Sequence, residues 1–547
     1  MKHTAKLLLS LLCSAMMWPQ HMPAQEKSLI VPDNSQYILT PLAPATPRIN
    51  SARVFGVRPK AEFRYTIAAT GDRPMTFSAE GLPKGLKLDA QTGIITGRLK
   101  KKGTYKVQLR AKNNLGEAER DLRIEVGEDI LLTPPMGWNS WNCWGKSVSQ
   151  EKVLSSARAM VEKGLVNYGY TYINIDDGWQ GIRGGEHNAI QPNKKFPDIK
   201  GLVDQIHGMG LKVGIYSAPW VATYLGHIGT QCDNPEGKYE WIEKGVCDEN
   251  YKIEDPEGKL HSGYFRYHGA YSFAEADARQ WAEWGIDYLK YDWNPNDYYY
   301  TKEMSEALRA TGRDIALSIS GSDPFAMAYT WPELVQCWRT TDDIFDTWAS
   351  IMRIGFGPQD RWPAFSGPGH WADADMLVVG MVGWGPNLHY TRLTPDEQYT
   401  HISLWALFSS PFLIGCDIAQ MDDFTLSLLC NYEVNDICQD PLGMRAVPYF
   451  RGDGYVVYVK ILENGNLAVG LFNTSTKPQK IGFTPRTLGL WSDKIFIRDV
   501  WRQKDVAEIG PRDRYEQEVD PHGAALLLVS PPNTLEKIVH KPYTIKR

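Results

Sequence analysis

The pattern of hydrophobic and polar positions divides the chain into regions of two kinds. From 25 to 128, short runs alternate between apolar and polar residues, as in Phe63–Ile67 and Thr104–Leu109, and glycine- and proline-containing turns separate them. A period of two is typical of a β-strand with one buried face, and several short strands with frequent turns indicate a sandwich. Residues 441–531 show the same character. The further strands expected there are Gly454–Val459, Asn466–Phe472 and Ala524–Val529.

Between these regions, from 132 to 440, apolar runs alternate with amphipathic helical stretches. This repeated β-α order predicts a (β/α)8 TIM barrel. A doubly wound sheet is the alternative, but no G-x-G-x-x-G or P-loop follows any of the runs. The expected strands are Tyr172–Ile175, Lys212–Tyr216, Asp287–Tyr291, Ile315–Ile319, Gln336–Thr340, Met376–Val379 and Phe412–Gly415.

The N-terminus has the pattern of a secretory signal peptide, expected over 1–24. Lys2 and Lys6 precede a short apolar core, Leu7–Met17, and Met22–Ala24 is a plausible cleavage context. The core is too short for a stable transmembrane helix, and no transmembrane segment is expected elsewhere. We therefore expect an exported, periplasmic or extracellular protein, with 532–547 as a tail.

Composition narrows the function classes. The net charge of −5 comes from 59 basic and 64 acidic residues that are well mixed, so no nucleic-acid partner is expected. Aromatic residues make up 12% of the chain, which suits both large cores and sugar-stacking sites. The cysteines form no C-x-x-C pair, which argues against a zinc site. Cys232 and Cys247 flank one loop and are candidates for a disulfide bond.

Lys290 and Asp292 are the first candidate for chemistry. They lie two residues apart near the end of an apolar run, so a strand would place both on one face. A neighbouring ammonium lowers the pKa of a carboxylate and keeps it ionised, as a covalent glycosidase requires of its nucleophile. A structural ion pair is the alternative interpretation.

Further acids and aromatics follow the other expected strands. In a TIM barrel the strand ends meet at one face, where active sites form. Single acids at such ends are often helix N-caps, but acids or aromatics at most of the ends indicate a site. A metal site would also cluster aspartates, but no histidine or calcium-binding loop accompanies them, and no cofactor is expected. The candidates are Trp138, Asp176, Asp177, Tyr216, Lys290, Asp292, Arg339, Asp342, Asp343, Asp373 and Asp375.

Several motifs together resemble the α-galactosidases of glycoside hydrolase family 27. They extend in order from Leu132 to Pro531, and they are Thr133–Asn139, Tyr172–Trp179, Gly214–Tyr216, Leu289–Asp292, Trp338–Asp343, Gly367–Trp371 with Asp375–Met376, and Gln439–Gly443. Residues 25–128 resemble a bacterial immunoglobulin-like module, from motifs in Leu82–Gly97 and Gly103–Asn113. This module implies a β-sandwich whose binding or spacer role the sequence leaves open.

The resemblance to family 27 implies a retaining mechanism, in which two carboxyls lie about 5–5.5 Å apart. It implies Asp292 as nucleophile and Asp343 as acid/base, whereas the residues alone leave Asp342, Asp343 and Asp346 open. The resemblance also implies substrate-binding roles. Arg339 would hold the 2-hydroxyl, Asp176 and Asp177 the 4- and 6-hydroxyls, and Lys290 a ring hydroxyl. Trp138 would stack on or wall the ring, and Tyr216, Asp375 and Met376 would line the pocket.

Departures from the family pattern affect loops and specificity. Trp293 and Gly178 occupy positions that many members use for disulfide cysteines, and the loop over 218–269 is long. Ser320 replaces a glutamate that reads the 2-hydroxyl in many α-galactosidases, so the 2-position is open. The expected substrate is an α-galactoside. The alternatives are an α-N-acetylgalactosaminidase, a β-L-arabinopyranosidase, an isomaltodextran-type hydrolase, or a carbohydrate-binding protein on an inactive barrel. The oligomeric state is not predicted.

Overall fold

The computed structural model describes residues 31–239, 253–254, 260–261, 266–321 and 324–532. The expected signal peptide lies outside these residues, as do nearly all of the expected tail and Cys247. The expected pairing of Cys247 with Cys232 is therefore not observed either way. No helix of the described residues is long and apolar enough to cross a membrane.

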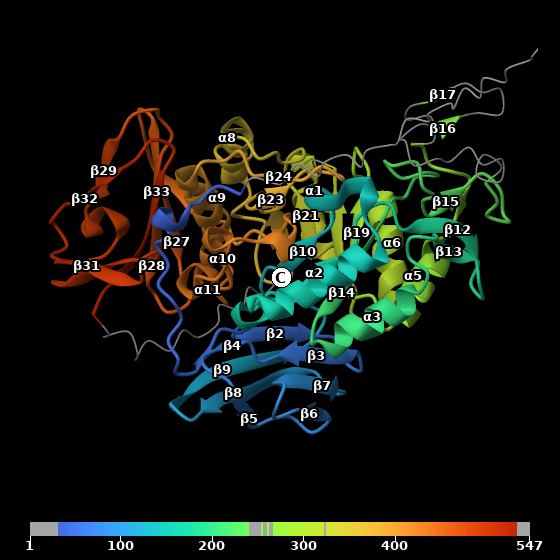
Figure 1. Ribbon diagram of the computed structural model, residues 1–547, viewed down its shortest axis with the longest axis horizontal. Coiled ribbons are helices and arrows are strands. Elements are labelled where there is room, and N and C mark those ends of the chain that lie inside the picture. Colours follow the sequence, from blue (N-terminus) through green and yellow to red (C-terminus); the bar gives the residue numbers. More distant parts are fainter. Residues whose placement is uncertain (1–30, 240–252, 255–259, 262–265, 322–323, 533–547) are drawn as a thin grey trace, which may run out of the picture.

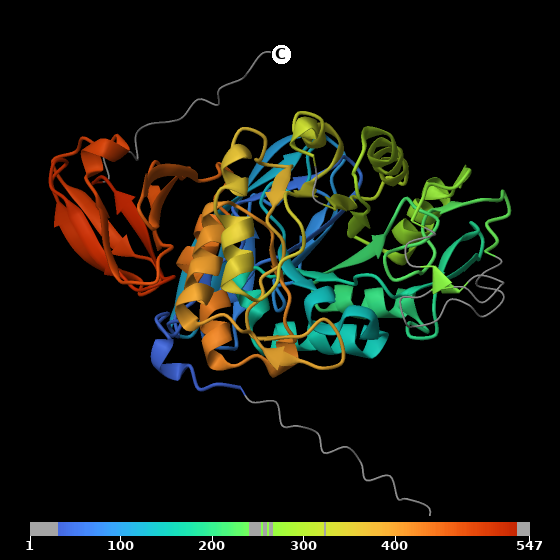
Figure 2. The ribbon, with the colours of Figure 1, turned by 90° about the horizontal axis from the view of Figure 1, so that it is seen from above.

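A barrel of parallel strands forms the centre of the molecule (Figures 1 and 2). Its sheet has the order β22-β21-β20-β19-β14-β11-β10-β25, and a parallel bridge between Leu377 and Ile414 connects the segment after β22 to β25. The predicted TIM-barrel class is confirmed. The strands are β10 (Met136–Asn139), β11 (Tyr172–Asn174), β14 (Lys212–Ser217), β19 (Tyr288–Asp292), β20 (Ala316–Ser320), β21 (Cys337–Arg339), β22 (Trp371–Asp373) and β25 (Phe412–Ile414).

The seventh strand differs from the prediction. Met376–Val379 was expected to form it, but the strand is β22, Trp371–Asp373, and the expected segment contributes only the bridge at Leu377. The apolar run is fully buried although it is not a strand. Burial alone therefore produced the hydrophobic pattern, and a short apolar run does not distinguish a strand from a buried loop.

Helices cover the outside of the barrel, and several begin at the side-chain caps that their sequences supply. Ser149, Asp198, Asp297 and Thr347 each accept a backbone N–H of the first turn, and Thr394 forms a capping box with Glu397. The helices are α1 (Trp141–Trp144), α2 (Gln150–Glu162), α3 (Ile199–Gly208), α5 (Ala274–Trp284), α6 (Tyr298–Ala310), α7 (Trp331–Leu334), α8 (Trp348–Gly355), α9 (Pro395–Leu407), α10 (Asp423–Leu429) and α11 (Tyr432–Cys438).

The N-terminal immunoglobulin-like domain has its own hydrophobic core and packs below the barrel in Figure 1. Arg58 pairs with Asp314 at 3.3 Å, and Glu62 pairs with Arg313 at 2.8 Å. Both partners on the barrel directly precede β20, so the domain covers the N-terminal ends of the strands. Its sheets are β2 (Val54–Val57), β9 (Gly116–Val126), β8 (Gly103–Asn113) and β5 (Thr76–Glu80), and β3 (Glu62–Thr66), β7 (Ile94–Arg98) and β6 (Leu86–Leu88).

The C-terminal sandwich packs beside the barrel. Lys460 is fully buried at this junction, where its ammonium donates to Ser409 Oγ at 2.6 Å and to the Ile437 carbonyl. The domain thus docks partly through a buried cation. Its strands are β26 (Val447–Gly452), β27 (Tyr455–Ile461), β28 (Leu467–Asn473), β33 (Ala524–Ser530), β30 (Ile495–Asp499) and β31 (Lys504–Ile509), with β29 (Gln479–Phe483) paired to β32 (Tyr515–Val519).

Candidate active site

A cavity of about 610 Å³ opens where the C-terminal ends of the barrel strands meet. Five adjacent strands, from β11 to β21, deliver polar side chains to it from residues near their C-terminal ends or shortly after them. The structure brings together most of the residues singled out from sequence. Those that line the cavity are Asp176, Asp177, Tyr216, Lys290, Asp292, Ser320, Asp342 and Asp343.

Asp292 is the last residue of β19, opposite Ser320 of β20. The Tyr216 hydroxyl donates to Asp292 Oδ2 at 3.0 Å. Burial raises the pKa of Asp292 to about 6, although the Lys290 ammonium acts to lower it. Lys290 thus lowers this pKa as expected, but the loss of solvent outweighs one neighbouring charge and the net shift is upward.

Lys290 makes its direct contact with a different carboxylate. Its Nζ donates to Asp176 Oδ2 at 2.8 Å, and Asn139 Nδ2 donates to the same oxygen at 2.9 Å. Burial opposes the charge of Lys290, but Asp176 and Asp292 together raise the pKa of Lys290 above its ordinary range. Lys290 therefore remains a cation between Asp176 and Asp292.

Asp177 is held by the loop after β14. Its Oδ1 accepts from the Thr223 hydroxyl and its Oδ2 from the Leu225 backbone N–H, both at 2.9 Å. Burial raises the pKa of Asp177 to about 7 in spite of these two donors. The adjacent Asp176 and Asp177 both line the cavity because β11 has already ended at Asn174 and the backbone turns at Gly178, where φ is +116°.

The three aspartates after β21 have different environments. Asp346 is fully buried and bound by Arg392, whereas Asp342 lies at the rim and pairs with Arg353 at 3.3 Å. Asp343 pairs with Arg339 at 3.2 Å, and its side chain is 63% exposed. Burial acts to raise the pKa of Asp343, but Arg339 and Lys290 outweigh it and the pKa is lowered.

Arg339 and Asp375 act beneath the cavity surface. Arg339 Nη2 lies 2.9 Å from Asp375 Oδ2, and the other Arg339 terminal nitrogen lies 3.5 Å from Ser320 Oγ. Asp375 also accepts the Ile344 backbone N–H at 2.7 Å. Asp375 therefore orients both the arginine and the segment that carries Asp343.

Some predicted residues lie outside the cavity wall. Trp138 is fully buried and donates its indole N–H to the Cys416 carbonyl, and Met376 is buried as well. Trp141 lines the cavity in their place. The other lining residues that sequence reasoning missed are Tyr224, Arg266, Asn294, Gly321, Thr341, Phe345 and Arg353. The length of the loop after β14 was the available signal for Tyr224 and Arg266.

No group of three or more His, Cys, Asp or Glu side chains in the described part of the chain is arranged to hold a metal ion. The acids at the strand ends are instead engaged with Lys290, Arg339 and hydroxyl or backbone donors. Two carboxylates that line this cavity have pKa values shifted in opposite directions, since the pKa of Asp292 is raised and that of Asp343 is lowered. Two further carboxylates, Asp176 and Asp177, can accept hydroxyl donors.

Comparison with known proteins identifies relatives of this site and of each domain. The α-galactosidase A family model matches residues 133–245 and 254–440. The model of the α-galactosidase C-terminal β-sandwich domain matches 452–529, and an Ig domain model matches 45–127.

Individual relatives agree with these models. An α-galactosidase of Cyamopsis tetragonoloba is 33% identical, covering 78% of this chain and 93% of its own. An α-galactosidase A of Cellvibrio japonicus is 31% identical, covering 74% and 93%.

Solved structures extend the comparison to the fold. A Bacteroides fragilis protein provisionally assigned as an α-galactosidase/melibiase is 34% identical with a TM-score of 0.75, covering 89% of this chain and 98% of its own. A β-L-arabinopyranosidase of Geobacillus stearothermophilus is 30% identical with a TM-score of 0.62, covering 74% and 97%.

Proposed function

Because the chain belongs to the α-galactosidase family of glycoside hydrolases, family 27, we propose that it is an exported retaining exo-glycosidase that releases terminal α-galactose. The observation that carries the proposal is the placement of Asp292 and Asp343 on one cavity together with the Asp176–Asp177 pair. The substrates are α-galactosidic oligo- or polysaccharides.

In the first step, Asp292 Oδ attacks the anomeric carbon while Asp343 donates a proton to the leaving oxygen. The glycosidic bond breaks and a glycosyl-aspartate forms. In the second step, Asp343 takes a proton from water, which attacks the same carbon and releases Asp292. The Tyr216 hydroxyl, 3.0 Å from Asp292 Oδ2, orients the nucleophile.

In the free protein, the pKa of Asp292 is higher than that of Asp343, and substrate binding must reverse this order. A proton prefers Asp292, whose pKa is about 6, over Asp343, whose pKa is lowered beside Arg339. The reaction instead needs the proton on Asp343 and an ionised Asp292. In our proposal the sugar 2-hydroxyl competes for Arg339, which loosens the Arg339–Asp343 pair and raises the pKa of Asp343. Substrate binding therefore prepares the acid.

The Asp177 carboxylate favours galactose over the pentose of a β-L-arabinopyranosidase. A carboxylate that accepts from the 6-hydroxyl has no partner on a ring without the hydroxymethyl group. Ser320, on the cavity wall, leaves an N-acetylgalactosaminidase as the second candidate, since its small side chain leaves space beside Arg339. The intact Arg339–Asp343 pair favours a 2-hydroxyl.

The proposal is tested by Asp292→Asn and Asp343→Ala, assayed on aryl α-galactosides and on the matching 2-acetamido sugars. We expect Asp292→Asn to abolish turnover with an unchanged circular dichroism spectrum. Asp343→Ala should retain more activity on substrates with a good leaving group, which need less protonation. Turnover of Asp292→Asn close to that of the wild type would contradict the nucleophile assignment. It would indicate that a different residue is the nucleophile, and it would argue against the inactive-barrel alternative.

Export rests on the lysines and apolar core of residues 1–24. Expression of the full chain, cell fractionation and mass determination of the product test it. The expected product lacks the first 24 or so residues and is found outside the cytoplasm. An uncleaved, cytoplasmic product contradicts export without affecting the proposed reaction.

A further inference from the structure

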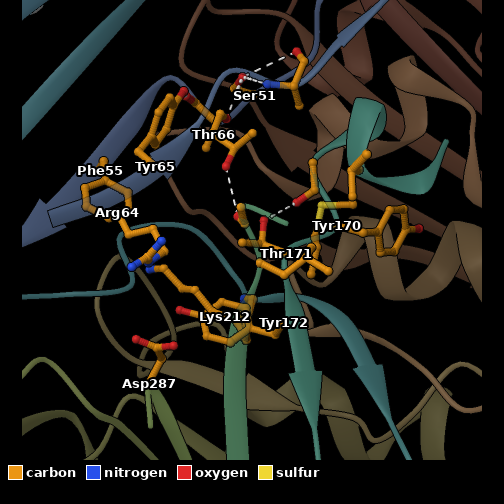
Figure 3. Close-up of a pocket in the computed structure, with 18 of the residues that line it drawn as sticks. Ser51, Phe55, Arg64, Tyr65, Thr66, Tyr170, Thr171, Tyr172, Lys212 and Asp287 are labelled. Carbon is orange, nitrogen blue, oxygen red and sulfur yellow. Dashed lines mark hydrogen bonds between the residues drawn. The ribbon is translucent and has the colours of Figure 1, made fainter. Parts of the chain in front are cut away.

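A second cavity lies at the opposite end of the barrel, between the immunoglobulin-like domain and the N-terminal ends of the strands (Figure 3). Its volume is about 590 Å³, close to that of the candidate active site. Strands β2 and β3 form one wall, and the starts of β11 and β14 form the other. Cavities of this size accommodate small molecules.

The acidic side chains of this cavity are engaged in ion pairs. Glu62 pairs with Arg64 at 2.9 Å and with Arg313 at 2.8 Å. Asp287 pairs with Arg313 at 2.6 Å and with His207 at 2.8 Å. The third acid, Asp314, pairs with Arg58 of the immunoglobulin-like domain, as described above. Each of these carboxylates already has an arginine partner, so a further cation nearby interacts with them only at longer range.

Lys212, the first residue of β14, is that further cation. Among the residues that the structure describes, no acceptor forms a hydrogen bond or ion pair with its ammonium, which instead lies 4.9 Å from the Phe55 ring and 5.4 Å from the Tyr172 ring. Burial lowers the pKa of Lys212, although Asp287 and Asp314 act from a longer distance to raise it, and the nearby Arg313 and Arg64 act in the same direction as burial. Arg64 Nε is itself buried without an acceptor. A partly buried ammonium without a counterion in direct contact is costly, so the site favours an anion.

About half of the lining surface is apolar. Aromatic rings and aliphatic side chains surround the ammonium, and hydroxyls such as Thr66 and Thr171 already donate to backbone carbonyls. Figure 3 shows Lys212, Arg64 and Phe55 on one side of the cavity and Tyr170 on the other. The aromatic side chains of the lining are Phe55, Tyr65, Phe77, Tyr170 and Tyr172.

We infer that this interdomain cavity is a binding site for a small carboxylate with an apolar body, whose carboxylate pairs with Lys212. A single ammonium with few free donors matches a monoanion better than a phosphate dianion, which needs several donors. The apolar part of the lining contacts the rest of the ligand. Because one wall belongs to each domain, the ligand stabilises the docked arrangement of both.

The site is separate from the sugar-binding cavity. Lys212 and Tyr172 begin β14 and β11, whereas Tyr216 and the Asp176–Asp177 pair lie at or beyond the other ends of the same strands. The inference therefore does not depend on the proposed reaction, and galactose should not compete with the carboxylate.

Isothermal titration calorimetry on the whole protein tests the inference. The probe is 3-phenylpropanoate, and the control ligand is the neutral 3-phenylpropanamide, which lacks the negative charge. We expect the wild type to bind the acid at least about tenfold more tightly than the amide, the value of one charge-assisted contact. Lys212→Met should remove that preference. Lys200→Met, at an exposed lysine of α3, should not change it. The acid should also raise the melting temperature of the wild type and not that of Lys212→Met.

Three results would overturn the inference. They are no binding of the acid at millimolar concentration, equal affinity for acid and amide, and unchanged affinity in Lys212→Met. Displacement of the acid by galactose would place the probe in the sugar cavity instead. Circular dichroism checks that Lys212→Met folds, and Lys212→Arg, which retains the charge, should keep the preference for the acid if Lys212→Met proves unstable.

Discussion

At the scale of single residues, protonation of Asp292 controls the reaction proposed here. Its pKa of about 6 means that activity is lost as pH falls through that value, because the nucleophile must be ionised. The Tyr216 hydroxyl lowers this pKa by donating to the ionised form. Tyr216→Phe should therefore move the acid limb of the kcat/KM profile to higher pH. An unchanged limb in a folded variant contradicts the role of Tyr216.

Asp177 carries the second prediction at this scale. A carboxylate that accepts from a sugar hydroxyl is worth on the order of 1.5–3 kcal/mol, so its loss should lower kcat/KM about tenfold to a hundredfold. We expect Asp177→Ala to lose its preference for an α-galactoside over the matching β-L-arabinopyranoside. Equal slowing of both substrates would mean that Asp177 does not read the 6-hydroxyl and only organises Thr223 and Leu225.

At the scale of elements, the segment between β21 and α8 must hold Asp343 over the cavity. Asp346, three residues later, anchors it through Arg392, whose backbone N–H donates at 2.9 Å and whose side chain forms an ion pair. Asp346→Asn should weaken this anchor and lower kcat by about tenfold on substrates with poor leaving groups, which depend on the acid. Substrates with good leaving groups should be less affected. Asp204→Asn, at an exposed acid of α3, is the control. Equal loss on both substrates would indicate a general structural defect.

At the scale of the whole molecule, the junction with the C-terminal sandwich contains the buried Lys460. Burial lowers its pKa to about 8, below its unfolded value of 10.5. The unfolded chain therefore binds more protons between these values, so stability rises with pH from about 8 to 10.5. The Lys460→Met variant should lack this rise, on the order of 3 kcal/mol. Urea unfolding of both proteins across this range measures it. If the free energies of unfolding of the wild type and Lys460→Met change with pH in the same way, the titration of Lys460 is not the cause of the rise.

The same scale shows how far local patterns reach. Hydrophobic periodicity and the motifs around Asp292 and Asp343 were enough to predict the barrel, both sandwiches and half of the cavity-lining residues. These features depend on residue type and spacing along one strand, and Lys290 and Asp292 share a face because strand geometry is local. The position of the seventh strand was predicted wrongly. Met376–Val379 is a buried loop, and its apolar pattern is the same as that of a buried strand.

The sequence by itself determined which elements form, in which order, and which acids end the strands. Only the tertiary structure decided the net pKa of Asp292, since desolvation depends on everything packed around it. It also decided that Trp141 rather than Trp138 lines the cavity. The cavity at Lys212 exists only because the immunoglobulin-like domain packs against the barrel there, a contact that no local pattern encodes.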